Sequence, residues 1–291
     1  TNIMYCLVRI ENNRMYPSEI PKETYDILKN GYLEMQEVIF VFKEFNQYKS
    51  ALIELEKWTH SVKTDPSMIM KNQEDAERLC QSVLTAFKNY LAHLKIHIEE
   101  KYGKESPLDN LYEKSRKNAR ESSIEFSFAY ELRNYAQHDN SIVHSVMSNH
   151  SYLKPASDPN ILLSRYPRWN RKEKTFISSY SGGIDLQDIF EKAYNSLGLI
   201  HQPIVQYLLD NSNVASNFFM FRTWMDKRFS REDAKFYNLA VAERADGSAA
   251  TMEDYEKGMP GLKFIAALID WEMVYEITDA LLPRRGSDAK D

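Results

Sequence analysis

The stretch that decides the fold is SIEFSFAYELRNYAQH, residues Ser123–His138. On a helix that turns by about 100° per residue, its apolar side chains fall on two opposite sides. One side carries Ile124, Phe128, Leu132 and Tyr135, and the other carries Phe126, Tyr130, Arg133 and Gln137. A helix that is apolar on two sides usually packs against two partners. We therefore expect one side to face the core of its own domain and the other to face a neighbouring domain or subunit.

Apolar residues at helical spacing also fill the sequence before this stretch. Pro21 predicts the start of a helix, and the apolar spacing predicts a long helix over Tyr32–Val62, which Asp65-Pro66 breaks. A second helix is expected over Gln73–Lys101, and Gly103 supplies its stop. Ser106-Pro107 then predicts the start of the helix that contains Ser123–His138. Long helices with short connections favour an antiparallel bundle.

The rest of the chain predicts smaller elements. Ile3–Ile10 is rich in β-branched and aromatic residues and predicts a strand that leads into a small hairpin. Irregular chain with a short hairpin is expected over 141–153 and 161–180, and further helices over 185–209, 216–229 and 259–282. The expected fold is therefore mainly α. Residues 1–140 would form the bundle with its N-terminal strand segment, and residues 141–291 a β-hairpin element plus C-terminal helices packed on the bundle.

A short motif closes the stretch Ser123–His138. The run Arg133-Asn134-Tyr135-Ala136-Gln137-His138 resembles the signature of the HEPN superfamily, an Arg followed by a polar residue and, shortly afterwards, a His. The resemblance covers Lys22 to Asn140. It implies a helical bundle that is commonly dimeric, with an active site where the two copies of the motif meet. Some toxin members carry a Tyr two residues after the His, where this chain has Asn140, so a modification of that Tyr is not implied.

The resemblance also implies an activity. Many HEPN proteins are metal-independent ribonucleases of toxin–antitoxin, abortive-infection and CRISPR-associated systems. It implies Arg133, Asn134 and His138 as catalytic residues, RNA as substrate, a homodimer, and an antitoxin or activator protein as a further partner, with no metal and no cofactor. An imidazole suits proton transfer, and the planar fork of Arg133 suits two phosphate oxygens. Asn134 would orient the imidazole or bind the phosphate.

Two other interpretations of the motif stay open. Arg133 and His138 are also what an ordinary interface of a helical protein would carry, as an ion-pairing and a hydrogen-bonding group. A HEPN-like module without catalysis would bind RNA, a nucleotide or a protein partner and use the motif helix only to dimerise. In an enzyme, two copies of Arg133 and His138 should face each other across a cleft that solvent reaches.

A second basic feature lies beyond the motif. Within Ser164–Lys174, cations alternate with aromatic residues, and Glu173 is the only acid. As an exposed loop, it would bind phosphates and stack its rings on unpaired bases. The candidate RNA-binding residues are Arg165, Arg168, Trp169, Arg171 and Lys172. The alternative is a solvated hairpin with two half-buried aromatic residues. A further set of cations, Lys114, Arg116, Lys117 and Arg120, precedes the motif and either extends a basic surface or simply stays solvated.

Composition narrows the remaining classes of protein. The 291 residues carry a net charge of −5, so a nucleic-acid contact must come from a local basic patch. Cys6 and Cys80 are the only cysteines, which favours a reducing compartment, and with no signal peptide or membrane span visible we expect a cytoplasmic protein. His93 and His97 have the spacing of a chelating pair but lack supporting ligands, so a buried, hydrogen-bonded His97 is the favoured interpretation.

Overall fold

The computed structural model describes residues 3–11, 14–61, 69–138, 141–148, 152–227, 230, 238–244, 262–269 and 271–281. Several expectations from the sequence lie outside these residues. They are the break at Asp65-Pro66, the interpretation of Asn140, and the first three residues of the helix expected over 259–282. Within the described residues the chain is mainly helical, with nine helices, as expected. None of the described helices is both long enough and apolar enough to cross a membrane.

The chain forms two compact units. The first consists of residues 1–40 and 208–291, and the second of residues 41–207. This division differs from the expected one, because the boundary placed at residue 140 falls inside the second unit. Two helices contribute residues to both units: α1, Lys22–Ser61, and α7, Leu186–Asp210. α1 begins directly after Pro21, where a helix start is expected, and the long helix expected from Tyr32 is its continuation.

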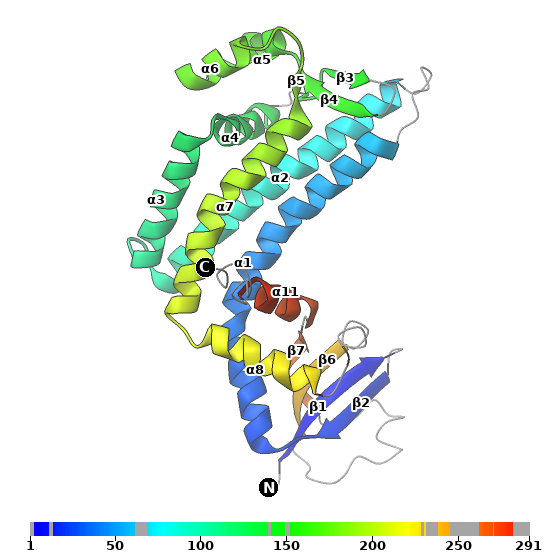
Figure 1. Cartoon of the computed structure of the whole chain (residues 1–291), viewed down its shortest axis with the longest axis vertical. Helices are drawn as coiled ribbons and strands as arrows, with labels where there is room; N and C mark the ends of the chain where they lie inside the picture. Colours follow the sequence, from blue (N-terminus) through cyan, green and yellow to red (C-terminus); the bar gives the residue numbers. More distant parts are fainter. Residues whose placement is uncertain are drawn as a thin grey trace, which may run out of the picture. The chain divides into compact units, whose positions relative to one another are not determined.

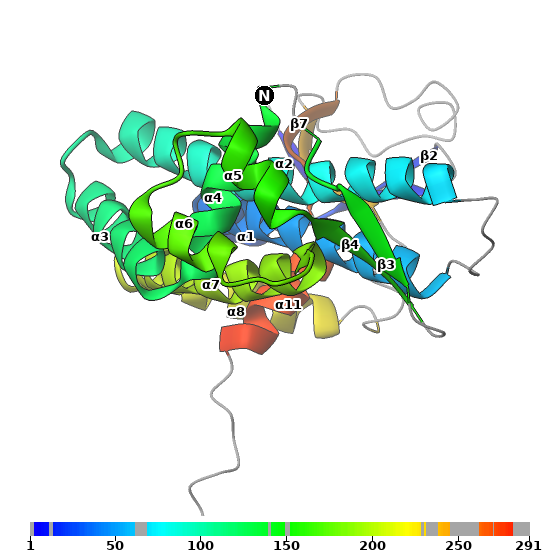
Figure 2. The same ribbon diagram turned by 90° about the horizontal axis from the view of Figure 1, so that it is seen from above.

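The second unit is a helical bundle with a small capping region at one end (Figures 1 and 2). Besides its parts of α1 and α7, it contains α2 (Ile69–Tyr102), α3 (Pro107–Ser122), α4 (Ile124–Ala136), α5 (Pro159–Arg165) and α6 (Arg171–Ser178). Its strands are β3 (Ser145–Ser148), β4 (Leu153–Ser157) and β5 (Ile184–Asp185), in the order β3-β4-β5.

Local sequence signals set the ends of these helices. Gly103 adopts a φ of +90° after α2, and the Ser106 side chain accepts a bond from the backbone amide of Asp109, so both expected signals are confirmed. The single helix expected from Ser106 through the motif is two helices. Ser123 is extended and caps α4 by accepting from the amide of Phe126. A serine that satisfies a free helical N–H lets a new helix begin in a new direction.

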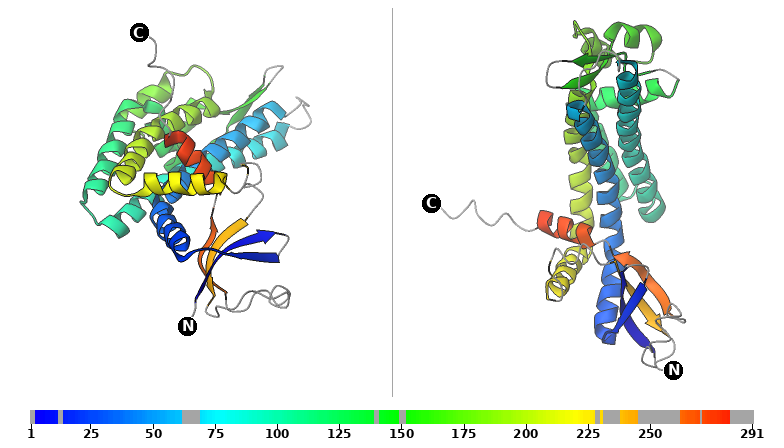
Figure 3. Two further views of the ribbon diagram at one scale, coloured as in Figure 1. Left: turned by 60° about the horizontal axis from the view of Figure 1, so that its bottom comes forward. Right: turned by 90° about the vertical axis from the view of Figure 1, so that its right-hand side faces the viewer.

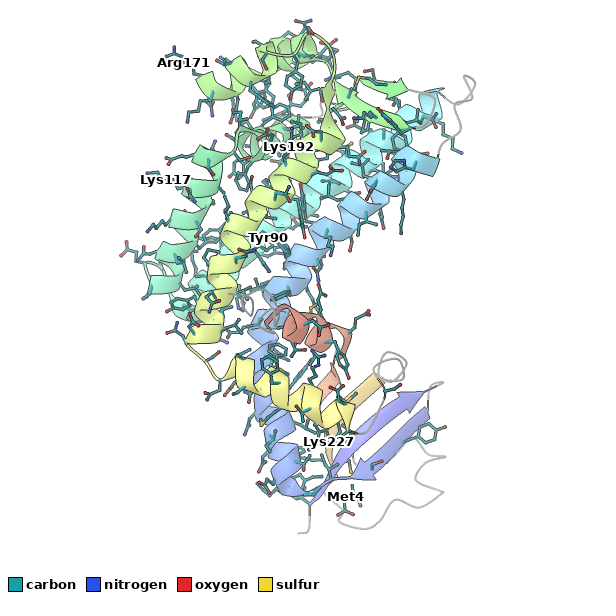
Figure 4. The ribbon with its side chains drawn as sticks, in the orientation of Figure 1. Met4, Tyr90, Lys117, Arg171, Lys192 and Lys227 are labelled. Atoms are coloured by element: carbon teal, nitrogen blue, oxygen red, sulfur yellow. The ribbon has the colours of Figure 1, made fainter. Side chains whose placement is uncertain are left out.

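Aromatic side chains form the core of the second unit. The ring of Tyr48 on α1 lies 5.8 Å from that of Phe87 on α2, and its hydroxyl donates to the carbonyl of Phe190 on α7 over 2.8 Å. His201 on α7 stacks on Phe45, with 4.0 Å between ring centroids. Its Nδ1 lies 3.3 Å from the hydroxyl of Tyr90, which Figure 4 labels on α2. A polar imidazole is therefore built into an aromatic core.

The capping region, which consists of β3, β4, β5, α5 and α6, differs from expectation in one part. A short hairpin is present, with β3 inside the expected range 141–153 and β4 mostly beyond it. The segment 161–180 is not irregular chain: it contains most of α5 and all of α6. Asp158 caps α5, and Asn170 forms a capping box with Glu173 at the start of α6. The Asn-x-x-Glu signature at residues 170–173 is a helix signal that the surrounding basic residues conceal. Asp185 caps α7 as expected, through the amides of Gln187 and Asp188.

The first unit contains a four-stranded antiparallel sheet in the order β2-β1-β6-β7 (Figure 3). The strands are β1 (Met4–Glu11), β2 (Arg14–Glu19), β6 (Asn238–Arg244) and β7 (Leu262–Ile269), and the accompanying helices are α8 (Val214–Asp226) and α11 (Trp271–Leu281). The expected N-terminal hairpin is confirmed. The helix expected over 259–282 is wrong in its first half, where the apolar run LKFIAALI forms β7.

Alternating side chains of β1 build the core of this sheet. Met4, Cys6 and Val8 are buried together with Ala242 of β6. The Tyr25 hydroxyl on α1 donates to the carboxylate of Glu243 on β6. This bond joins the start of α1 to a strand more than two hundred residues away in sequence.

The buried His201 predicts a pH dependence of stability. Burial lowers the pKa of His201 from 6.5 to about 4, so the unfolded chain binds a proton between these values and the folded chain does not. Stability should therefore fall as the pH drops from 6.5 towards 4, by about 1.4 kcal/mol per pH unit from this residue. Urea unfolding of wild type and His201→Phe at pH 7 and pH 5 should show a weaker pH dependence in the variant. The exposed control His60→Ala should match wild type, and equal pH dependence in all three proteins would contradict the prediction.

Candidate active site at the end of helix α4

Arg133 lies in the last turn of α4 and is only partly exposed. Its Nη1 atom is shielded from solvent and has no hydrogen-bond partner among the described residues. Burial lowers the pKa of the guanidinium, and within the described part of the chain no carboxylate offsets this effect. A shielded guanidinium nitrogen without an acceptor is costly, and an anion would approach Arg133 through the exposed part of its side chain.

A second cation stands beside Arg133. Lys88 projects from α2, and its Nζ lies 3.5 Å from the Oε1 of Gln137, which caps the C-terminus of α4. Burial, and then repulsion from Arg133, lower the pKa of Lys88. Two cations that lie close together favour an anion such as a phosphate.

The carboxylates near the motif are bound to other groups. Glu131 accepts from the Tyr166 hydroxyl over 2.5 Å and from the Asn134 amide over 3.2 Å. Glu173 accepts from the Ser127 hydroxyl over 2.7 Å and is almost completely buried. Because their hydrogen bonds hold these acids on other partners, Arg133 and Lys88 keep their positive charge available.

Asn134 lies in the last turn of α4, and His138 follows the end of the helix. Asn134 donates to Glu131, and among the described residues no hydrogen bond joins it to His138. His138 comes just after the end of α4 with an exposed side chain, and its backbone amide donates to the carbonyl of Tyr135 over 3.2 Å. The His138 ring lies 6.1 Å from that of Tyr166. Within one chain, the imidazole is thus reachable from solvent and Asn134 is not set to orient it.

Both apolar sides of α4 are covered within the chain. Phe126 contacts Phe87 of α2, with 5.1 Å between the rings. On the other side, Phe128 stacks on Trp169, with 5.5 Å between the rings. The second partner is therefore the segment joining α5 to α6, not a separate domain or subunit. The apolar character of α4 does not by itself require a dimer.

The candidate RNA-binding segment divides into a buried and an exposed part. Trp169 is 2% exposed, and its Nε1 donates to the carbonyl of Leu162 over 2.9 Å. The prediction that its ring stacks on an unpaired base is wrong, because the ring is part of the core against α4. The four candidate cations Arg165, Arg168, Arg171 and Lys172 are exposed, as is Lys174. Figure 4 labels Arg171 on α6, and the phosphate-binding role of these four residues stays a prediction.

Two residues of the site, Lys88 and Glu77, could not be identified from the sequence. Lys88 is one of several lysines on α2, and nothing in the local pattern distinguishes it before α2 and α4 are packed together. Glu77 accepts bonds from the backbone amides of Ile142 and Val143 and from the Ser141 hydroxyl, over 2.7 to 3.2 Å. It fixes the chain just after the motif. A carboxylate that binds backbone amides has no signature in sequence.

The favoured interpretation of the histidine pair on α2, a buried and hydrogen-bonded His97, agrees with the structure only in part, because His97 is half-buried. His93 pairs with Glu44 through its Nδ1, over 2.9 Å, and is about half exposed. Burial lowers the pKa of His97. Among the described residues, no group of three or more His, Cys, Asp or Glu side chains is arranged to hold a metal ion.

Comparisons of the chain with protein-family models, with curated proteins and with solved structures found no match. A function for this chain must therefore be argued from its own residues and their geometry.

Glu77 provides a test of how the site is held. Glu77→Ala removes the acceptor of two backbone amides and a hydroxyl, so we expect a loss of roughly 3 kcal/mol in the free energy of unfolding. Urea unfolding measures it. The control is Glu74→Ala, an exposed position on the same helix, which should change stability by less than about 0.5 kcal/mol. Equal losses in the two variants would show that Glu77 does not anchor this segment.

Proposed function

We propose that this protein is a metal-independent endoribonuclease of the HEPN type, with Arg133, Asn134 and His138 at its active site. The observation that carries the proposal is the partly exposed Arg133, which forms no ion pair among the described residues and stands beside Lys88 at the helix end that also presents His138. Cation pairs without a carboxylate suit a phosphodiester. The resemblance of the motif supplies the reaction.

The chemistry needs no metal. A base takes the proton of the 2′-hydroxyl, whose oxygen attacks the adjacent phosphorus, and the bond to the 5′-oxygen breaks as an acid protonates the leaving oxygen. The products are a 2′,3′-cyclic phosphate and a 5′-hydroxyl. Arg133 would hold two phosphate oxygens and stabilise the charge of the transition state, while Lys88 adds a second positive charge. His138 would transfer the protons.

One chain supplies one such histidine. A homodimer that brings two copies of Arg133 and His138 together would provide both a base and an acid. The site is exposed on the His138 side, as that arrangement needs. Asn134 would leave Glu131 and turn to the phosphate or the imidazole of the second copy when RNA binds.

The biological setting rests on the family resemblance alone. It points to a toxin or an antiphage defence protein acting on RNA in the cytoplasm, held in check by an antitoxin or released by an activator protein. The same resemblance includes members without catalysis, which bind RNA, a nucleotide or a protein.

The test is RNA cleavage in EDTA. Purified wild type should cut total RNA and leave cyclic phosphates and 5′-hydroxyls, whereas Arg133→Ala and His138→Ala should lose at least about a hundredfold in rate. The matched controls are Arg78→Ala and His93→Ala, which change exposed residues of the same types on α2 and should cut like wild type. End-group analysis of the fragments identifies the chemistry.

Two results would overturn the proposal. Intact RNA with all five proteins, including when an activator-containing extract is added, would favour the non-catalytic binding module. Equal cleavage by all five proteins would place the activity at another site or in a contaminant. A stable monomer that cuts RNA would remove the second copy from the mechanism.

A further inference from the structure

A groove between α3 and α4 lies close to the motif and has no role in the proposed reaction. Its volume is about 460 Å³. The lining residues are Lys114, Arg116, Lys117, Arg120, Phe126 and Tyr130, together with Glu113. The floor is aromatic and the rim is basic, and Lys117 is labelled on α3 in Figure 4. This combination of surfaces suits a ligand that has both a planar aromatic ring and an anionic group.

The rim keeps an excess of positive charge. The Glu113 carboxylate is shared between Arg116, over 2.7 Å, and Lys95 on α2, over 2.9 Å, so Arg116 is largely neutralised. Lys117 lies 3.9 Å from Glu121, and both side chains are well exposed, so this pair contributes little.

Two other cations of the rim stand apart from acids. Among the described residues, Lys114 and Arg120 form no ion pair. Both are exposed, as is Lys117. The phosphates of a strand that crosses the groove would therefore meet several cations that have weak acidic partners or none.

The aromatic floor is ordered for stacking. The Arg120 guanidinium lies 5.2 Å from the centre of the Tyr130 ring, and Tyr130 is half-buried. Phe126 beneath it is almost completely buried. Aromatic rings and guanidinium planes are the surfaces on which proteins stack unpaired bases, and double-stranded RNA keeps its bases away from such surfaces.

The groove and the motif share one side of α4. Phe126, Tyr130, Arg133 and Gln137 succeed each other at helical spacing, and Tyr130 precedes Arg133 by three residues, a rise of about 4.5 Å. A base stacked on Tyr130 and a phosphate held at Arg133 can therefore belong to one strand. The groove would then fix the position of the strand relative to His138.

We propose that the α3–α4 groove binds an unpaired nucleobase of single-stranded RNA, stacked on Tyr130 and Arg120 with neighbouring phosphates on Lys114 and Lys117, and that it selects which phosphodiester reaches Arg133. This inference rests on the proposed function for the reaction that comes after binding. The binding itself does not depend on cleavage and can be measured without it.

The experiment measures binding of a short fluorescent single-stranded RNA by anisotropy, in EDTA and in the His138→Ala background, where the RNA stays intact. Adding Tyr130→Ala should raise the Kd roughly tenfold or more, while Tyr130→Phe, which keeps the ring, should stay within about twofold. Lys114→Gln and Lys117→Gln should each reduce the slope of log Kd against log salt by about 0.7. Arg78→Gln, an exposed cation on α2, serves as the control and should leave the slope unchanged.

Four outcomes would overturn the inference. Binding that is unchanged in Tyr130→Ala would remove the stacking site. Equal affinity for a duplex of the same sequence would remove the preference for unpaired bases. Displacement of the RNA by a mononucleotide at equal concentration would make the groove a nucleotide site, and a change of oligomeric state in Tyr130→Ala would make it a subunit interface.

The failure of the inference and the failure of the proposed function can be told apart. Loss of binding in Tyr130→Ala, with wild type leaving RNA intact, would support the groove and reject the ribonuclease. Cleavage by wild type, with Tyr130→Ala binding and cutting at the same positions, would support the ribonuclease and reject the groove. Altered cut positions in Tyr130→Ala, with Tyr130→Phe like wild type, are the result that we expect.

Discussion

Helix α4 must be covered on two opposite sides, and the second unit is arranged around that constraint. Phe126 and Phe128 are only two residues apart, yet each packs against a different neighbour, Phe87 of α2 and Trp169 before α6. Burying two such rings contributes several kcal/mol. The chain must therefore return over α4 after the motif, and the buried contact between Ser127 and Glu173 fixes that return.

The same packing decides where charge remains available. Acids that lie near the motif are bound by hydroxyls and amides, so they hold the architecture together and do not neutralise the cations. Glu77, Glu131 and Glu173 all act in this way. Arg133 and Lys88 are left close together without a carboxylate, which is an unfavourable arrangement for an isolated chain and a favourable one for a chain that binds a polyanion. This separation of structural acids from available cations links the fold to the proposed reaction.

The sequence predicts the long helices and most of their ends, because helical periodicity, Gly103 and Ser106 act locally. The prediction of secondary structure fails where a short local signal competes with a stronger pattern in the same residues. The basic residues around Trp169 suggest an exposed loop, while the Asn170–Glu173 capping box, a four-residue signal, makes it the start of a helix. The apolar run of β7 is compatible with a helix in sequence because short apolar runs have no distinctive period. Arg133 and His138 can be named from their motif, but Lys88 joins them only through tertiary packing.

The pairing of β1 with β6 has a consequence for the order in which the parts of the chain fold. Met4 is aligned with Arg244 and Ile10 with Asn238, so the central pair of the sheet joins segments from the two ends of the described chain. A two-stranded hairpin is only marginally stable by itself. During synthesis, residues 41–207 emerge complete and can fold while β1 and β2 still wait for their partner strand. The helical unit can therefore fold before β6 has been synthesised, and closing the sheet is a later, long-range step.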